Sequence, residues 1–268
     1  MQHRTLLHRC IINRFCDNIN MSQQHPENLE VIAANLQEVK QRMQAAHQRR
    51  RCEGREPTLL AVTKYAEPDW IEALYQLGER DFGESRPQQL ASRNEHYSAN
   101  NGWNDLRWHL IGQLQRNKVK AIIGKTSCIH SVNSLRLLQQ IARHAADQQL
   151  PTRVLLQINI SGEQAKQGFG SEEILAISKQ LGSSKYFSIC GLMTMAPKNQ
   201  ENDAIRAVFR DLRELRDKLQ QQVPEQTFLS ELSMGMSHDY EIAIEEGATI
   251  VRIGSELFQS CTSESNND

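Results

Sequence analysis

The sequence predicts a single α/β domain folded as a (β/α)8 TIM-type barrel, with one extra helix at the N-terminus. Short apolar runs alternate with helical patterns about eight times along the chain, and strands joined by crossover helices lie parallel. The chain has 268 residues, close to the roughly 250 of a typical closed eight-stranded barrel. It shows no linker and no second hydrophobic unit. An open doubly wound sheet is the alternative, since it has the same alternation.

The elements follow one another in a regular order. The first helix is predicted over residues 26–48, where apolar side chains recur at spacings of three and four. The first strand, 59–62, leads into Lys64, and Pro68 then opens a helix that Gly78 ends. Helical patterns at 135–145 and 205–219 have one apolar face. The other strands are expected near 80–83, 107–111, 127–131, 153–160, 187–192, 227–232 and 249–253.

The chain divides into three predicted parts. Residues 1–24 form an extension that is expected to be disordered, unless translation starts at Met21; a basic mitochondrial-type presequence is the alternative. Residues 25–262 form the barrel, and residues 263–268 are a polar, frayed tail. Because only residues 254–268 follow Ile253, the last outer helix must be short, and the N-terminal helix is expected to cover the gap.

Composition excludes several classes of function. The 31 basic and 32 acidic residues nearly cancel, for a net charge of −1, so neither nucleic acid nor an anionic membrane is expected as a partner. No apolar run approaches the roughly 20 residues that span a bilayer. The six cysteines are scattered, without a CxxC pair or the His/Cys spacing of a zinc site. These features predict a cytoplasmic protein with reduced thiols and no metal.

Gly and Ser residues near the ends of the last two strands predict a phosphate site. The segments 233–237 and 252–255 follow the seventh and eighth predicted strands, where barrels commonly bind phosphate. Glycine lets backbone N–H groups approach a ligand, and serine adds a hydroxyl donor. Ser237 is also placed to cap the next helix. Ordinary turn chemistry would explain either loop alone, but two such loops favour phosphate. The candidate ligands are Gly235, Ser237, Gly254 and Ser255.

Lys64 is the candidate nucleophile. Strand alternation places it on one face with Leu60 and Val62, so we expect its amine to be partly desolvated. Desolvation favours the uncharged amine, which is the form that attacks an aldehyde. Taken alone, Lys64 also fits a lysine that reaches out to solvent. Beside a phosphate site, however, the amine predicts pyridoxal 5′-phosphate, which carries both an aldehyde and a phosphate.

Two further side chains are candidates for the same site. Arg252 shares a face with Ile250 and is expected inside the barrel, where it needs an acceptor. It would bond either the phosphate or the pyridine nitrogen, and in the second case would keep that nitrogen unprotonated. A salt bridge to a carboxylate such as Glu84 is the alternative. His109 ends the third predicted strand and either lines the barrel mouth or is structural.

These residues lie in segments that resemble the pyridoxal phosphate homeostasis protein family, also described as alanine racemase N-terminal-domain-like. The resemblance covers roughly residues 27–258 and is specific because many short motifs match in order. The matching segments are Ala61-Val62-Thr63-Lys64 with Pro68, Phe82-Gly83-Glu84, residues 109–118, Asn159 with Glu163, Lys166 and Gly168-Phe169, residues 191–195, residues 233–237 through Asp239 to Ala243-Ile244, residues 247–249, and residues 251–255 with Phe258.

The resemblance implies a fold-type III barrel with the cofactor aldehyde on Lys64. It also implies that Ser237 and Gly254-Ser255 hold the phosphate and that Arg252 lies near the ring. Two departures from the family pattern affect this picture. Ser85-Arg86 follow Glu84 where the family has Asn-Tyr, which puts a contact from the second strand in doubt. Gln259 replaces a glycine, which we expect to be harmless.

The function implied is buffering or delivery of the vitamin B6 cofactor, with PLP-requiring apoenzymes as partners and no established turnover. The alternative is a PLP-dependent racemase-like enzyme, which needs a second base on the opposite face of the substrate. In the racemases that base comes from an added β domain, which the chain is not expected to contain, so a monomeric carrier is favoured. A lysine-dependent aldolase barrel without a cofactor is a further alternative.

Overall fold

The structure is a computed structural model, and it describes residues 26–100, 102–161, 167–197 and 200–262. The predicted extension at 1–24 and the tail at 263–268 lie outside the described residues. Within these ranges the strands are β1 (Thr58–Val62), β2 (Asp81–Glu84), β3 (Arg107–Leu110), β4 (Cys128–Val132), β5 (Thr152–Gln157), β6 (Phe187–Met193), β7 (Glu231–Met236) and β8 (Ile250–Ile253).

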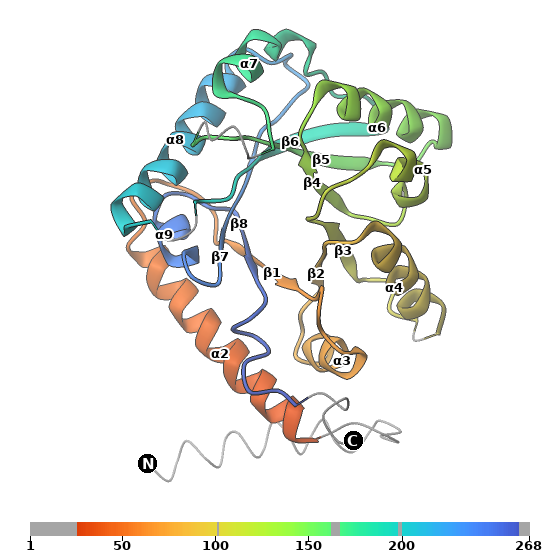
Figure 1. The fold of residues 1–268 in the computed structure, drawn as a ribbon, viewed down its shortest axis with the longest axis vertical. Helices are drawn as coiled ribbons and strands as arrows, with labels where there is room; N and C mark the ends of the chain where they lie inside the picture. The colour runs from red at the N-terminus through yellow and green to blue at the C-terminus, as the bar shows by residue number, and fades with distance from the viewer. Residues whose placement is uncertain (1–25, 101, 162–166, 198–199, 263–268) are drawn as a thin grey trace.

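Helices connect the strands on the outside of the sheet (Figure 1). The α-helices are α2 (Pro26–Gln48), α3 (Pro68–Gln76), α4 (Pro87–Asn100), α5 (Val119–Ile122), α6 (Leu135–Gln148), α7 (Ser171–Ala176), α8 (Asn202–Gln220) and α9 (Tyr240–Glu245). Two 3-10 turns, η1 (Arg116–Lys118) and η2 (Ser178–Gln180), complete the described elements.

The strands close into one barrel in chain order, with every neighbouring pair parallel. The closure is made by β1 and β8, where Leu60 pairs with Arg252. The predicted barrel is therefore confirmed, and the open-sheet alternative is wrong. This closure matters for function because it brings the first and last strands side by side.

The seventh strand lies further along the chain than the sequence indicated. It was expected at 227–232 but runs from Glu231 to Met236, so most of the Ser/Met/Gly segment is strand and not loop. Thr227 belongs to the preceding loop, where its hydroxyl donates to the carbonyl of Leu181 over 3.1 Å. The polar Ser233 stays within the strand because its hydroxyl is hydrogen-bonded inside the barrel. The fifth strand likewise ends at Gln157 and not at residue 160.

The hydrophobic core lies between the strands and the helices. Phe82 and Trp108 occupy neighbouring strands with ring centroids 5.5 Å apart, and both are buried. Helix α6 buries the face that its spacing predicted, including Leu138 and Ile141, and Ser134 caps its N-terminus. Alternation then directs the remaining strand residues into the barrel. That interior is unusually polar, with His109, His130, Ser233 and Arg252 buried near a small cluster of Cys128, Leu155, Cys190 and Met193.

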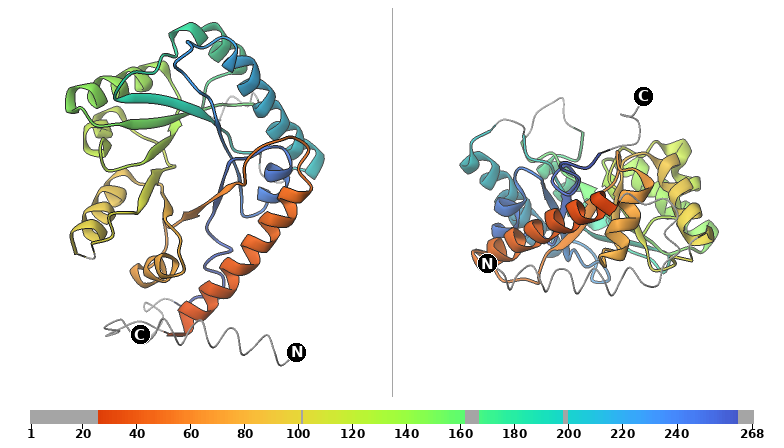
Figure 2. Two further views of the ribbon diagram at one scale, coloured as in Figure 1. Left: turned by 180° about the vertical axis from the view of Figure 1, so that it is seen from behind. Right: turned by 90° about the horizontal axis from the view of Figure 1, so that it is seen from below.

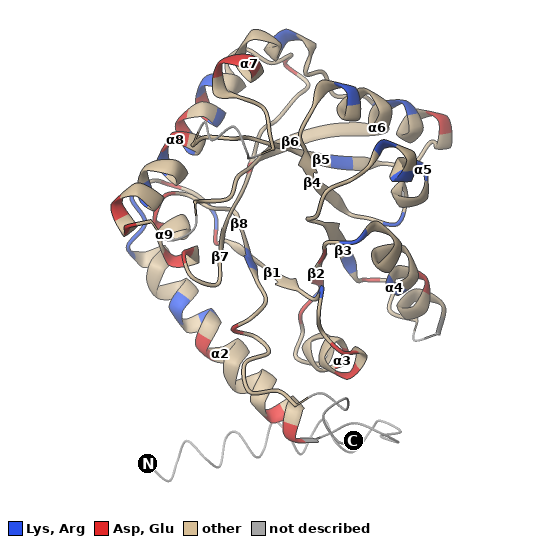
Figure 3. Cartoon of the chain, in the orientation of Figure 1, with Lys and Arg blue, Asp and Glu red and all other residues tan. Residues whose placement is uncertain are grey.

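Helix α2 covers the side of the barrel that the short chain end leaves open, as predicted. It lies against α3 and α9 in both views of Figure 2. Ion pairs fix it there: Arg42 donates to Glu241 over 2.9 Å and to Glu256 over 3.2 Å, and Arg49 donates to Glu245 over 2.8 Å. Figure 3 shows that α2, α8 and α9, which lie on the outside of the barrel, carry both basic and acidic residues.

Helix α2 also holds the segment that follows β8. The side-chain amide of Asn35 donates to the carbonyls of Leu257 and Gln259, over 3.2 Å and 2.9 Å. Asn28 and Thr262 exchange two hydrogen bonds of 3.1 Å each. This segment carries Phe258 to the carboxyl ends of the strands. The side chain of Gln259 is exposed, consistent with a harmless replacement. In the described part of the chain, no helix combines the length and apolarity needed to cross a membrane.

Candidate functional site

A cavity of about 600 Å³ opens at the carboxyl ends of the strands. Five of the six predicted site residues line it: Lys64, Ser237, Arg252, Gly254 and Ser255. Its size lies within the roughly 300–1,000 Å³ typical of ligand pockets. Closure of the barrel forms this cavity, because it brings residues about 190 positions apart in the sequence to the same space.

The sixth predicted residue, Gly235, lies in β7 and is not part of the cavity lining that the structure describes. Its φ of +91° is a conformation that side-chain-bearing residues rarely adopt. A Cβ at this position would lie 2.6 Å from the Cβ of Ala243 and 2.9 Å from the Cα of Tyr240. Gly235 therefore allows α9 to pack closely on β7.

A different residue from the expected one occupies the N-cap position of the next helix. Helix α9 begins at Tyr240 with Asp239 as its N-cap, so the prediction that Ser237 caps it is wrong. Asp239 accepts a hydrogen bond of 2.6 Å from the backbone N–H of Met236 and closes the turn after β7. Ser237 is left facing the cavity, where it accepts a hydrogen bond of 2.9 Å from the Ser255 hydroxyl.

The two loops lie against β1. A Cβ at Gly254 would come within 3.0 Å of the Val62 carbonyl oxygen, so a residue without a side chain keeps this loop close to the strand that leads to Lys64. Ser237, Gly254 and Ser255 thus form one edge of the cavity. Hydroxyls and backbone of this kind are the groups with which barrels bind phosphate.

Lys64 lies in a turn two residues after β1 and not at the strand end. Its side chain is exposed, so the expected partial desolvation is not found; the turn lifts the residue away from the apolar strand. Its Nζ lies 5.1 Å from the centre of the Tyr65 ring.

Arg93 on α4 holds the Lys64 turn from behind. Its guanidinium donates to the carbonyl of Thr63 over 2.6 Å and to that of Ala66 over 2.8 Å. It also donates to Glu84 over 2.7 Å, and that carboxylate is fully buried. The two carbonyls flank Lys64 and Tyr65, so this pair fixes the backbone on both sides of the amine.

Arg252 is buried and contributes to the wall of the cavity. Its guanidinium donates to the hydroxyl of Ser233 over 2.7 Å and to the carbonyl of Thr194 over 2.9 Å. The alternative salt bridge to Glu84 is not formed, because that carboxylate pairs with Arg93. Burial lowers the pKa of Arg252 to about 10, which keeps it a cation at neutral pH.

His109 is not part of the described cavity lining. Its ring nitrogens lie 3.0 Å from a nitrogen of His130 and 3.1 Å from a carboxylate oxygen of Asp81. The alternative of a buried, hydrogen-bonded histidine therefore describes it better than a position at the mouth.

Several cavity residues were not among the predicted site residues. Trp70 and Phe258 stack with centroids 5.3 Å apart and form an aromatic wall. Ser85 also lines the cavity, at the position where the family has asparagine. The other lining residues are Val62, Tyr65, Ala66, Ile111, Met193, Met195, Met236 and His238. Trp70 could have been found from its place two residues after the Pro68 that opens α3.

Known proteins are similar to this chain in sequence. Residues 28–260 match the model of the alanine racemase N-terminal domain family. A pyridoxal phosphate homeostasis protein from Aquifex aeolicus is 40% identical over 200 residues, which cover 75% of this chain and 85% of that protein. Its counterpart from Pseudomonas aeruginosa is 35% identical over 233 residues, covering 86% of this chain and 96% of that protein.

Solved structures agree with the sequence relatives. PipY of Synechococcus elongatus with PLP bound has a TM-score of 0.73 and 32% identity, covering 85% of this chain and 99% of that chain. Alanine racemase from Corynebacterium glutamicum has a TM-score of 0.61 at 15% identity, covering 85% of this chain and 60% of that chain, and this likeness shows the fold alone. From the family model and these relatives, the chain belongs to the pyridoxal phosphate homeostasis protein family.

Proposed function

We propose that this protein holds pyridoxal 5′-phosphate as a Schiff base on Lys64 and serves to buffer or deliver the cofactor inside the cell. The observation that carries the proposal is a single cavity that joins the Lys64 amine to the loops after β7 and β8. When bound, the cofactor supplies an aldehyde that condenses with an amine and a phosphate that needs an anion site. The PLP-bound structure of PipY supports the same assignment.

The phosphate would be held at the cavity edge formed by Ser237, Gly254 and Ser255. The 2.9 Å bond between the two hydroxyls shows that they face the same point. An anion there would accept a hydrogen bond from each, and hydrogen bonds to charged groups contribute about 1.5–3 kcal/mol. Gly254 keeps the backbone open to the same ligand.

Arg252 would face the ring. It is anchored by hydrogen bonds to Ser233 and Thr194, so the protein itself positions the guanidinium before the ligand binds. A fixed cation beside the pyridine nitrogen would keep that nitrogen unprotonated, which makes the cofactor a weak electron sink.

The openness of the cavity supports a carrier role. Lys64 is exposed, and its neighbours Tyr65 and Met195 are 75% and 43% exposed. An accepting PLP-requiring apoenzyme could therefore approach the bound cofactor. We propose that the protein does this as a monomer in the cytoplasm, where the unpaired thiols found among the described cysteines would stay reduced.

The test is borohydride reduction of the protein loaded with PLP, followed by peptide mapping. We expect one reduced adduct, on Lys64. The Lys64→Ala variant should lose the adduct and the visible absorption band while still binding some PLP through its phosphate. Lys118→Ala provides the control, because Lys118 is not among the residues that line the cavity. An adduct on another lysine, or an unmodified Lys64 after loading, would overturn the assignment.

The racemase-like alternative is tested with the same preparations. Sustained turnover of an amino acid by the pure protein, abolished by Lys64→Ala, would replace the carrier proposal with an enzymatic one. Absence of a chromophore together with cleavage of a phosphorylated aldol by wild-type protein would instead favour a cofactor-free aldolase.

A further inference from the structure

A continuous chain of hydrogen bonds runs through the barrel from the cavity that contains Lys64 to its opposite end. Arg252 donates to the Ser233 hydroxyl over 2.7 Å, and that hydroxyl lies 2.9 Å from Nδ1 of His130. Nε2 of His130 lies 3.0 Å from Nδ1 of His109. Nε2 of His109 lies 3.1 Å from Oδ1 of Asp81. The five residues come from five different strands, so the chain exists only in the closed barrel.

The residues at the two ends of this hydrogen-bond chain, Asp81 and Arg252, each have a definite charge. Burial alone would raise the pKa of Asp81, but hydrogen bonds from Arg107 and His109 outweigh it and lower the pKa to about 2. Asp81 is therefore a carboxylate and can only accept. At the other end, Arg252 can only donate.

When both imidazole rings are neutral, these two ends determine where each proton in the hydrogen-bond chain lies. His109 must donate from Nε2 to Asp81, which leaves its Nδ1 as an acceptor when the ring is neutral. His130 must then donate from Nε2, and its own Nδ1 accepts from Ser233. Every hydrogen bond consequently points from Arg252 toward Asp81. With both rings neutral, both histidines are therefore Nε2–H tautomers.

Charged and titratable groups surround the two rings. Burial, followed by His109, Arg252 and Arg153, lowers the pKa of His130 well below its usual value. The Cys128 sulfur lies within 4.8 Å of one ring nitrogen of each histidine. Cys190 and Glu231 lie beyond it and interact with Cys128 and Arg153.

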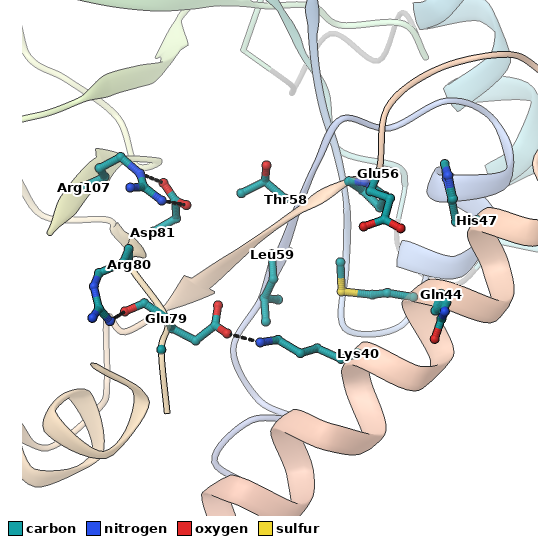
Figure 4. Close-up of a pocket in the computed structure, with 13 residues that line it drawn as sticks. Lys40, Gln44, His47, Glu56, Thr58, Leu59, Glu79, Arg80, Asp81 and Arg107 are labelled. Carbon is teal, nitrogen blue, oxygen red and sulfur yellow. Dashed lines mark hydrogen bonds and ion pairs between the residues drawn. The ribbon is translucent and has the colours of Figure 1, made fainter. Parts of the chain in front are cut away.

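Asp81, at the far end of the hydrogen-bond chain, lines a second cavity. This cavity has a volume of about 410 Å³ and is lined by Asp81, Arg107, Thr58 and Lys40, among others. Figure 4 shows Asp81 hydrogen-bonded to Arg107 on one side of it, and Lys40 of α2 paired with Glu79 on another. Arg107 donates to Asp81 over 2.8 Å and 2.7 Å. A change in the contacts of Asp81 at the amino ends of the strands would therefore alter its hydrogen bonding.

We propose that Ser233, His130, His109 and Asp81 form a one-directional hydrogen-bond relay that positions Arg252 and couples the Lys64 cavity to the cavity at the opposite end of the barrel. The identity of the ligand at the Arg252 end rests on the proposed function. The relay itself depends only on contacts within the chain. These four residues act on the ligand through Arg252 and are positioning residues.

The first test uses the protein without cofactor and is independent of the proposed function. Imidazole ¹⁵N spectra of the full chain should show His109 and His130 as Nε2–H tautomers at neutral pH. In Ser233→Ala the Nδ1 resonance of His130 should move, because its donor is lost, while both rings keep their tautomers. An Nδ1–H tautomer at either residue would overturn the relay.

The second test measures coupling along the relay. Adding PLP to wild-type protein should shift the His130 resonances through Arg252, and Ser233→Ala should abolish that shift. Asp81→Asn should weaken PLP binding by about fivefold, in the usual range of coupling between sites. The matched control is Asp105→Asn, which removes an exposed carboxylate paired with Arg80 near the same end of the barrel.

The outcomes separate the two proposals. If PLP forms no Schiff base with Lys64, the proposed function fails but the tautomer measurement still decides the relay. If Asp81→Asn binds PLP no differently from Asp105→Asn, the coupling is refuted even with the expected tautomers. Should Asp81→Asn fail to fold, the PLP-induced shift in wild-type protein and its loss in Ser233→Ala decide the coupling.

Discussion

The hydroxyl of Ser255 donates a hydrogen bond of 2.9 Å to the hydroxyl of Ser237 across the gap between the loops after β8 and β7. The two residues are 18 positions apart in the chain, and parallel pairing of β7 with β8 brings them together. Two hydroxyls that satisfy each other can turn jointly toward an anion. This pair is therefore the structural core of the expected phosphate site.

Removal of either hydroxyl should weaken binding through the phosphate alone. For Ser255→Ala we expect the affinity for PLP to fall roughly 10- to 100-fold, which corresponds to about 1.5–3 kcal/mol for the loss of one hydrogen bond to a charged group. Affinity for pyridoxal, which lacks the phosphate, should stay unchanged and is the internal control. Titration of the visible absorption band measures both. An equal loss for the two ligands would show that Ser255 does not contact the phosphate.

Loss of Arg93 should destabilise the protein and loosen the Lys64 turn. Arg93→Met leaves the Glu84 carboxylate buried without its partner, and such changes cost about 3–5 kcal/mol. Urea unfolding should report that loss, and the rate of Schiff base formation with PLP should fall as well. The double variant Arg93→Met/Glu84→Gln is the control for charge. It should recover part of the stability but not the rate, because the bonds to Thr63 and Ala66 stay broken.

The ion pair of Asp81 should make the free energy of unfolding decrease as the pH falls into the acid range. The pKa of Asp81 is lowered to about 2 in the folded protein, against an ordinary value of 3.8. A lowered folded pKa contributes stability that is present above the unfolded value and is lost as pH falls toward the folded value. Wild-type protein should therefore lose about 2 kcal/mol more than Asp81→Asn between roughly pH 5 and pH 2. Denaturant unfolding at a series of pH values checks this, and parallel curves for the two proteins would contradict it.

The aromatic wall should control how long the cofactor stays bound. Trp70 and Phe258 are half-buried and stack at 5.3 Å beside the cavity, and truncation of such an aromatic side chain removes apolar contact area. We expect Phe258→Ala to speed release of PLP to an apoenzyme acceptor by about tenfold, while the reduced adduct still maps to Lys64. Phe228→Ala is the control, since Phe228 is 71% exposed and is not among the cavity residues. Equal rates of PLP release from the two variants would show that the Trp70–Phe258 wall does not slow release of the cofactor.

The amino-acid sequence was enough to predict the barrel and the approximate position of the candidate site. Apolar runs alternating with helical faces indicated eight parallel strands, and the position of Lys64 after the first run placed the amine at the carboxyl ends. The Ser237 and Gly254-Ser255 loops could also be found, since barrels use these positions for anions. Such features are local, because spacing along the sequence sets which residues share a face.

Tertiary structure alone decided how these residues are supported. No local pattern shows that Arg93 on α4 holds the Lys64 turn, that Gly235 packs on α9, or that Ser233 lies inside β7. The hydrogen-bond chain from Arg252 to Asp81 links residues from five strands, and only closure of the barrel brings their inward-facing side chains within bonding distance. The hydrogen-bond partners of buried polar groups depend on which strands face one another across the barrel. Residue spacing along a single strand does not contain that information.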